Sequence, residues 1–84
     1  MMQYIATFFS HFGALRFERL CKDKGYAAQV RPVPRSLSSS CGSCVYFSAP
    51  VLKDEQLAAL RTPELEQLVC EACAGYEFLY RAEE

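Results

Sequence analysis

The chain has 84 residues, of which 51% are hydrophobic and 23% are charged. This size and composition predict one small globular domain, residues 1–84, with a thin core that a metal, a partner or a second copy would help to stabilise. The formal net charge of −1 provides no general attraction for nucleic acid, and no apolar run has the length of a membrane span.

The charge is unevenly distributed along the chain. The first fifty residues hold six Lys or Arg and two Asp or Glu, whereas the remaining residues hold three and eight. Such an uneven charge distribution usually reflects a solvated surface. It also favours docking of a partner or pairing with a second copy as a homodimer.

Cysteine is abundant, with five residues in the chain. The first eleven residues contain neither a basic leader nor a long apolar run. We therefore expect a cytoplasmic protein that uses its thiols for metal or redox chemistry rather than for structural disulfides.

The first third of the chain predicts a strand followed by a helix. Residues 3–9 are rich in aromatic and branched side chains, which is typical of a buried strand. Ser10 is a suitable N-cap, and apolar residues at helical spacing continue to Lys24, where Gly25 ends the helix. Cys21 lies on the apolar face of this helix, so we expect a core side chain.

The middle of the chain predicts two strands joined by a polar loop. Residues 26–31 form the first of these strands and residues 45–48 the second. The loop between them contains two prolines and a serine-rich stretch, and it ends in Cys41 and Cys44.

The last third predicts two helices and a final strand. Residues 53–61 have helical spacing, and the threonine, proline and glutamate at 62–64 are typical of a new helix start. We therefore expect a further helix over residues 63–74 and a strand over residues 76–81. The resulting fold class is α+β, a ferredoxin-like split βαβ fold (β-α-β-β-α-β) with an extra helix before the last strand.

In that fold, three places share one end of the sheet. They are the exit of the first strand, the loop between the second and third strands, and the start of the last strand. These places carry His11, the pair Cys41 and Cys44, and the pair Cys70 and Cys73. The sequence therefore predicts four cysteines and the single histidine at one end of the sheet.

The two Cys-x-x-Cys pairs support a metal hypothesis. Two thiolates at this spacing can bind one ion, and the second pair would lie on one side of the predicted helix. Four thiolates suit zinc or an iron–sulfur cluster, with Cys41, Cys44, Cys70 and Cys73 as ligands. The alternative for the second pair is simple packing in the core.

A nucleophilic hypothesis needs fewer residues. Cys41 lies in a loop near Arg35 and, in the predicted topology, near a helix start, so its thiolate would be favoured. Such a cysteine can accept sulfur or selenium as a persulfide-type adduct, and Cys44 would resolve that adduct as a disulfide. We expect four residues to stabilise the adduct: Arg35, Ser40, Gly42 and His11.

No triad of catalytic residues, pair of carboxylates or phosphate-binding glycine loop is recognisable. The sequence therefore favours a carrier or accessory protein over a self-contained enzyme. A third hypothesis is a protein-interaction module that uses an exposed edge strand and no thiol chemistry.

Residues 4–48 resemble the Se/S carrier protein-like family, short bacterial proteins otherwise described as a domain of unknown function. The most specific part of the resemblance is the proline-containing loop that leads to Cys41 and Gly42. The matching residues are Tyr4-Ile5-Ala6-Thr7-Phe8, Ser10-His11, Ala14, Glu18, Gly25, Pro32-Val33-Pro34-Arg35, Leu37, Ser40 and Cys41-Gly42.

The resemblance implies that Cys41 is the carrier cysteine, with Gly42 beside it. It also implies that the partners are a cysteine desulfurase or another sulfur- or selenium-handling protein. We expect the likeness to end after residue 48, because the predicted helix over residues 63–74 would be an addition to the family pattern.

Overall fold

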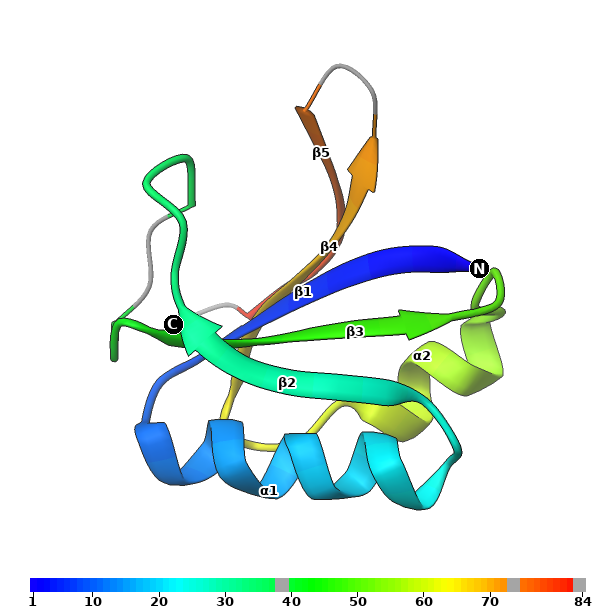
Figure 1. Cartoon of the computed structure of the whole chain (residues 1–84), viewed down its shortest axis with the longest axis horizontal. Coiled ribbons are helices and arrows are strands. Elements are labelled where there is room, and N and C mark those ends of the chain that lie inside the picture. The colour runs from blue at the N-terminus through cyan, green and yellow to red at the C-terminus, as the bar shows by residue number, and fades with distance from the viewer. Residues whose placement is uncertain (38–39, 73–74, 83–84) are drawn as a thin grey trace.

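The computed structural model describes residues 1–37, 40–72 and 75–82. They form an α+β domain with one antiparallel sheet, in which the strands have the order β2-β3-β1-β4-β5. Helices α1 and α2 lie against the same face of this sheet (Figure 1). In chain order the elements are β1 (Met2–Phe8), α1 (His11–Asp23), β2 (Ala27–Pro32), β3 (Ser43–Ala49), α2 (Asp54–Leu60), β4 (Leu65–Ala72) and β5 (Gly75–Arg81).

The predicted helix over residues 63–74 is wrong, because Leu65–Ala72 is the strand β4. Leu65, Leu68 and Val69 match helical spacing, which caused the error. In the structure β4 lies between β1 and β5 and has side chains buried on both of its faces, so apolar residues need not alternate along it. The extra helix before the last strand is therefore replaced by a β4–β5 hairpin, and the described residues contain five strands instead of four.

The start and end of α1 agree with the sequence signals. The Ser10 hydroxyl oxygen accepts a hydrogen bond from the Gly13 amide at 3.1 Å, which satisfies one amide of the first turn. Gly25 has a positive φ of 85° directly after the helix, and the Tyr26 amide donates to the Cys21 carbonyl at 2.9 Å. Cys21 itself is fully buried, so its predicted core position is confirmed.

Two clusters of buried side chains lie on opposite faces of the sheet. Alternate residues of β1 divide between them, because side chains of a strand point to its two faces in turn. Tyr4, Ala6 and Phe8 contribute to the larger cluster, which also contains Phe17 of α1. On the opposite face, Ile5 belongs to the smaller cluster described next.

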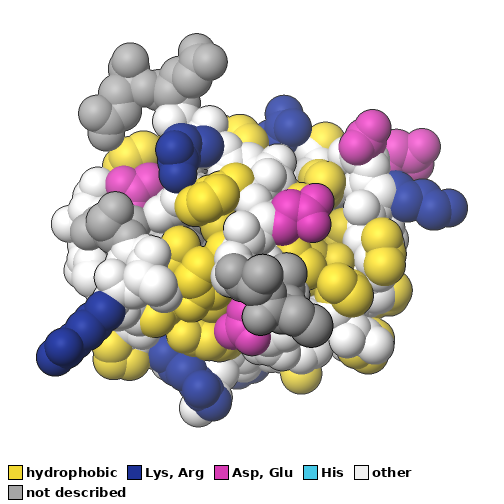
Figure 2. All heavy atoms as spheres, turned by 90° about the horizontal axis from the view of Figure 1, so that it is seen from above, with side chains coloured by type: hydrophobic (Ala, Val, Ile, Leu, Met, Phe, Trp, Pro, Cys, Tyr) yellow, Lys and Arg dark blue, Asp and Glu magenta, His cyan; other side chains and the backbone are white. Residues whose placement is uncertain are grey.

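The loop between β2 and β3 covers part of the face that has no helix. Leu37 of this loop is buried against Ile5, Cys44 and Val69. Figure 2 looks onto this side of the molecule, where hydrophobic side chains gather near the centre with acidic side chains among them. The loop is thus packed onto the sheet through an apolar contact.

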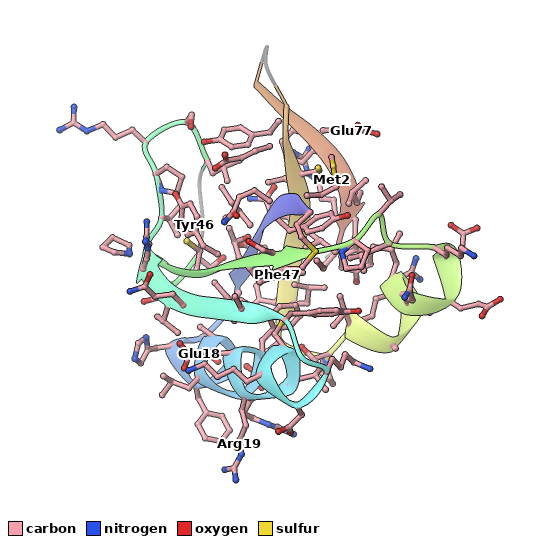
Figure 3. The ribbon with its side chains drawn as sticks, turned by 45° about the vertical axis from the view of Figure 1, so that its right-hand side comes forward. Met2, Glu18, Arg19, Tyr46, Phe47 and Glu77 are labelled. Atoms are coloured by element: carbon pink, nitrogen blue, oxygen red, sulfur yellow. The ribbon has the colours of Figure 1, made fainter. Side chains whose placement is uncertain are left out.

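The exposed edge of β2 is partly covered by α1. Glu18 of α1 accepts a hydrogen bond from the Val30 amide at 3.1 Å, and Figure 3 shows the Glu18 side chain between the helix and this strand. The bond fixes the helix against the edge of the sheet and occupies an amide that would otherwise be available to another strand. In the described part of the chain, neither helix is long and apolar enough to cross a membrane.

At Gly13, α1 closely approaches the segment before β4. A Cβ atom at this position would overlap the Cβ of Glu64. Replacing a helical glycine with alanine normally stabilises a helix by about 1 kcal/mol. We expect Gly13→Ala instead to reduce the free energy of unfolding by about 1–3 kcal/mol, measured by urea denaturation, because the helix must move away from Glu64.

A double-mutant cycle identifies the cause of this effect. In a Glu64→Gly background the side chain that obstructs the new methyl group is absent, so Gly13→Ala should become neutral or stabilising. An equal loss of stability in both backgrounds would show that the contact with Glu64 is not responsible.

Candidate functional site

The loop that carries Cys41 is closed at its base by a backbone hydrogen bond. The Val33 amide donates to the Gly42 carbonyl at 3.1 Å, and the Leu37 amide donates to the Pro34 carbonyl at 3.0 Å within the loop. Gly42 has a φ of 75°, a conformation that residues with a Cβ rarely adopt. These features place Cys41 in a tight turn immediately before β3.

Glu66 of β4 fixes the residue before Cys41. Its carboxylate accepts hydrogen bonds from the Ser40 amide at 3.2 Å and from the Ser40 hydroxyl at 2.6 Å. The same carboxylate accepts a bond from the Thr7 hydroxyl at 3.3 Å. One side chain therefore joins the loop, β1 and β4, and sequence reasoning missed it because nothing in the local sequence distinguishes Glu66 from a surface carboxylate.

The N-terminus of α1 lies beside the Cys41 turn. His11 Nδ1 and Ser43 Oγ are 3.0 Å apart, which is hydrogen-bonding distance. The expected proximity of His11 to the segment from Cys41 to Cys44 is therefore confirmed. The Ser10 hydroxyl donates to the carboxylate of Glu64, so the same helix end is also joined to the segment before β4.

Cys41 differs from the other described cysteines in its exposure. Its side chain is half-buried, whereas Cys21, Cys44 and Cys70 are buried. The Cys41 Sγ donates to the Ser43 carbonyl at 3.4 Å and packs against the edge of the larger core cluster. Among the cysteines that the structure describes, Cys41 is thus the most accessible to a reagent or a partner.

Cys44 is held as a buried thiol. Its Sγ lies 3.6 Å from the Pro32 carbonyl, to which it donates. Its pKa is raised to about 11, chiefly by burial and also by the neighbouring Cys41, while Arg31 on the adjacent strand partly opposes both effects. At neutral pH this group is therefore protonated, and a protonated thiol is a weak nucleophile.

The expected gathering of the two cysteine pairs at one end of the sheet is wrong. Cys44 is paired with Thr7 on the face covered by the loop, whereas Cys70 is paired with Tyr4 on the face covered by the helices. Burial raises the pKa of Cys70, and Glu77 and Glu71 add to this effect. Cys73 lies outside the described residues.

This separation follows from β4 being a strand. Cys44 of β3 and Gln67 of β4 both pair with Thr7, so they lie at the same level of the sheet. Cys70 lies three residues further along β4, and three residues of a strand span about 10 Å. The sheet itself lies between the Cys44 and Cys70 side chains, so these two sulfurs cannot share an ion. Over residues 1–37, 40–72 and 75–82, no group of three or more His, Cys, Asp or Glu side chains is arranged to hold a metal.

The residues expected to stabilise an adduct have different surroundings. Arg35 is exposed in a turn of the loop, and both polar groups of Ser40 are bonded to Glu66. Arg31, which the sequence analysis did not select, is the basic residue opposite Cys44. Its guanidinium lies 5.1 Å from the centre of the Tyr46 ring and donates two hydrogen bonds to Gln29.

Comparison with known proteins identifies the family of the chain. The sequence model of the family described as "Putative Se/S carrier protein-like" matches residues 3–69. The chain belongs to this family. The match extends well beyond residue 48, so the expectation that the likeness ends there is wrong. It includes Cys41, Cys44 and Glu66, and it stops before Cys70 and Cys73.

No curated protein and no solved structure matches the chain.

Exposure predicts the order in which the cysteines react. In a Cys73→Ser background we expect iodoacetamide to modify Cys41 first, at least about tenfold faster than Cys21, Cys44 or Cys70, because those three are buried. Peptide mass spectrometry at successive times measures this order. A comparable initial rate at Cys44 would show that this thiol is accessible in solution, contrary to the structure.

The raised pKa of Cys44 predicts a loss of stability at alkaline pH. The unfolded chain ionises this thiol from its ordinary pKa of 9.0, whereas the folded chain does so at about 11. Stabilisation by Cys44 is therefore complete below pH 9 and is lost as the pH rises to about 11. We expect the stability advantage of the wild type over Cys44→Ala to decrease across this interval, on the order of 1–3 kcal/mol.

Urea denaturation at pH 9 and 11 measures this advantage. Val45→Ala is a suitable control, because Val45 is a buried neighbour on β3 without an ionisable group. Its stability deficit should be the same at both pH values, and a deficit for Cys44→Ala that is equally constant would contradict the prediction.

Proposed function

We propose that this protein carries a sulfur or selenium atom on the Sγ of Cys41 and passes it to another protein. The observation that carries the proposal is the partial exposure of Cys41, the one described cysteine that is not buried, inside the segment matched by the family. A carrier thiol must reach the active sites of its partners, and a turn at the edge of the sheet allows this approach.

The transfer step requires no cofactor. The Cys41 thiolate attacks the outer sulfur of a donor persulfide, and a new S–S bond forms between Cys41 Sγ and that sulfur. The S–S bond of the donor breaks at the same time, and its inner sulfur leaves as a thiolate. Atoms and electrons are conserved, so the step needs neither an oxidant nor a reductant from outside. A selenium donor reacts in the same way.

The neighbours of Cys41 support different roles in the carrier. The N-terminus of α1, marked by His11, provides positive potential beside the turn and would stabilise an anionic adduct. Gly42 leaves space on one side of the turn, since an added Cβ would meet no atom within 4 Å. Ser40 acts through its bonds to Glu66, which hold the turn in place, and Arg35 would contribute through the charge that it adds to the loop.

Cys44 fits the role of a resolving thiol less well than that of a core side chain. Its burial and its pKa of about 11 oppose the attack on an adduct that resolution requires. We therefore propose that the sulfur or selenium atom passes directly from Cys41 to the acceptor protein. Cys44 is then a core side chain that packs beneath the turn.

We also infer a ferredoxin-like path for the first part of the chain. In the strand order β2-β3-β1-β4, β3 lies between β1 and β2, and β1 lies between β3 and β4. This order supports two split βαβ units, β1-α1-β2 and β3-α2-β4, with β5 added beside β4. A cytoplasmic location is part of the proposal, because persulfide transfer between thiols needs reducing surroundings.

Mass spectrometry tests the proposal directly. We expect the purified wild-type protein to gain the mass of one sulfur atom on Cys41 after incubation with glutathione persulfide. Cys41→Ser should lose this gain, because serine has no sulfur with which to form the new bond. Cys44→Ser should keep it, since the buried thiol does not accept the sulfur.

The same spectra show how the proposal would fail. If Cys41→Ser gains sulfur at another position as fast as the wild type does, then Cys41 is not the acceptor. Circular dichroism of each variant confirms that the fold is retained, so that a loss of loading reports on the thiol.

A further inference from the structure

Helix α1 has a second apolar stripe that faces away from the sheet. Its inner face is buried through Ala14, Phe17 and Cys21. On its outer face, Phe12 is 63% exposed and Leu15 is 47% exposed. The outer face of a surface helix normally holds polar residues, so two large apolar side chains there indicate a contact surface.

Basic side chains accompany these apolar ones. Arg16 and Arg19 are exposed at helical spacing from Phe12 and Leu15, so the four residues form one stripe, here named the outer stripe. The Arg16 guanidinium lies 5.7 Å from the centre of the Phe12 ring, and Figure 3 shows Arg19 pointing away from the sheet. The outer stripe combines apolar anchors with positive charge, which is complementary to an acidic surface that has an apolar centre.

A groove runs beside the outer stripe. Its volume is about 570 Å³, and it is open to solvent. Thr62, from the segment between α2 and β4, lines the groove together with all four residues of the outer stripe. Among the residues that the structure describes, the Thr62 hydroxyl oxygen is buried and has no hydrogen-bond partner. This oxygen lies beneath the wall of the groove, so a group in the groove would contact the accessible part of Thr62 instead.

The outer stripe begins next to the Cys41 turn. Phe12 follows His11, whose ring nitrogen lies 3.0 Å from Ser43 Oγ, and the Ser43 carbonyl accepts the bond from Cys41 Sγ. Figure 1 shows the start of α1 and the start of β3 at the same edge of the molecule. A protein seated on the outer stripe would therefore have part of its surface close to Cys41.

We propose that the outer stripe of α1 is the docking surface for the protein that delivers sulfur to Cys41. This inference rests on the proposed carrier function. The partner has an acidic surface with an apolar projection beside its persulfide-bearing cysteine. The projection enters the groove near Thr62, carboxylates approach Arg16 and Arg19, and the persulfide is brought to Cys41. Docking supplies proximity, and the chemical step is the persulfide exchange already described.

The test compares two sulfur donors. One is a purified pyridoxal-phosphate cysteine desulfurase from the source organism, supplied with L-cysteine, and the other is glutathione persulfide. Initial rates of sulfur loading on Cys41 are measured by mass spectrometry for the wild type, Phe12→Gln, Arg16→Glu and Arg19→Glu. These positions are exposed and the new residues favour helix, so we expect the fold to be retained.

With the enzyme as donor, we expect each variant to be loaded at least about tenfold more slowly than the wild type, and the salt dependence of loading to weaken in the arginine variants. With glutathione persulfide, all rates should equal that of the wild type, because a small donor needs no docking surface.

Matched controls come from β5, which lies at the opposite end of the strand order from β2, the strand that contacts α1. Phe78 is a half-exposed aromatic residue, and Arg81 is an exposed basic one. Phe78→Gln and Arg81→Glu repeat the chemical changes elsewhere on the surface, and both should be loaded by the enzyme at the wild-type rate.

Three results would overturn the docking surface. They are no loading from the enzyme, equal loading of the wild type and the outer-stripe variants, or equal losses in the β5 controls. Light scattering adds a fourth, since a wild-type dimer that Phe12→Gln dissociates would show that a second copy occupies the outer stripe. Failure of glutathione persulfide to load the wild type would instead contradict the carrier function itself, so the two failures are distinguishable.

Discussion

The Glu66 carboxylate is the contact on which the geometry of the site depends. It accepts hydrogen bonds from both polar groups of Ser40 and from the Thr7 hydroxyl. These bonds connect three segments that are far apart in the chain, namely β1, the loop before β3, and β4. The turn that contains Cys41 therefore has its position set by the assembled sheet and not by the loop sequence alone.

Burial divides the described cysteines into two kinds. Cys21, Cys44 and Cys70 are buried, and burial raises the pKa of each. They contribute volume and apolar surface to the two clusters, as free cysteines often do. Cys41 lies where the larger cluster meets solvent, so its thiol can be reached by a reagent or a partner protein. Position on the sheet thus decides which thiol is available.

Local signals in the sequence predicted the first part of the fold well. The N-cap Ser10, the apolar spacing of α1 and the glycine at its end act over a few residues, and such short-range effects can be read directly from the chain. The proximity of His11 to the Cys41 segment followed from the chain path, and the structure confirms it.

The later part of the chain shows where this kind of reasoning fails. The apolar positions of residues 65–72 fit a helix as well as they fit a strand that is covered on both faces. The strand forms because β1 and β5 pair with this segment on either side. The predicted proximity of Cys70 to Cys44 failed for the same reason, because it required a helix there. Glu66 was missed since its partners Ser40 and Thr7 are distant in sequence, so no local pattern reveals the contact.

The bond from Val30 to Glu18 has a consequence for how this sheet can be enlarged. A strand added beside β2 would have to displace the Glu18 carboxylate from an amide that it already satisfies. On the opposite side of the sheet, β5 lies beside β4 and outside the segment that the family match covers. The β2 edge is therefore the less favourable side for the addition of a further strand, because pairing there would first break the contact that fixes α1 to the sheet.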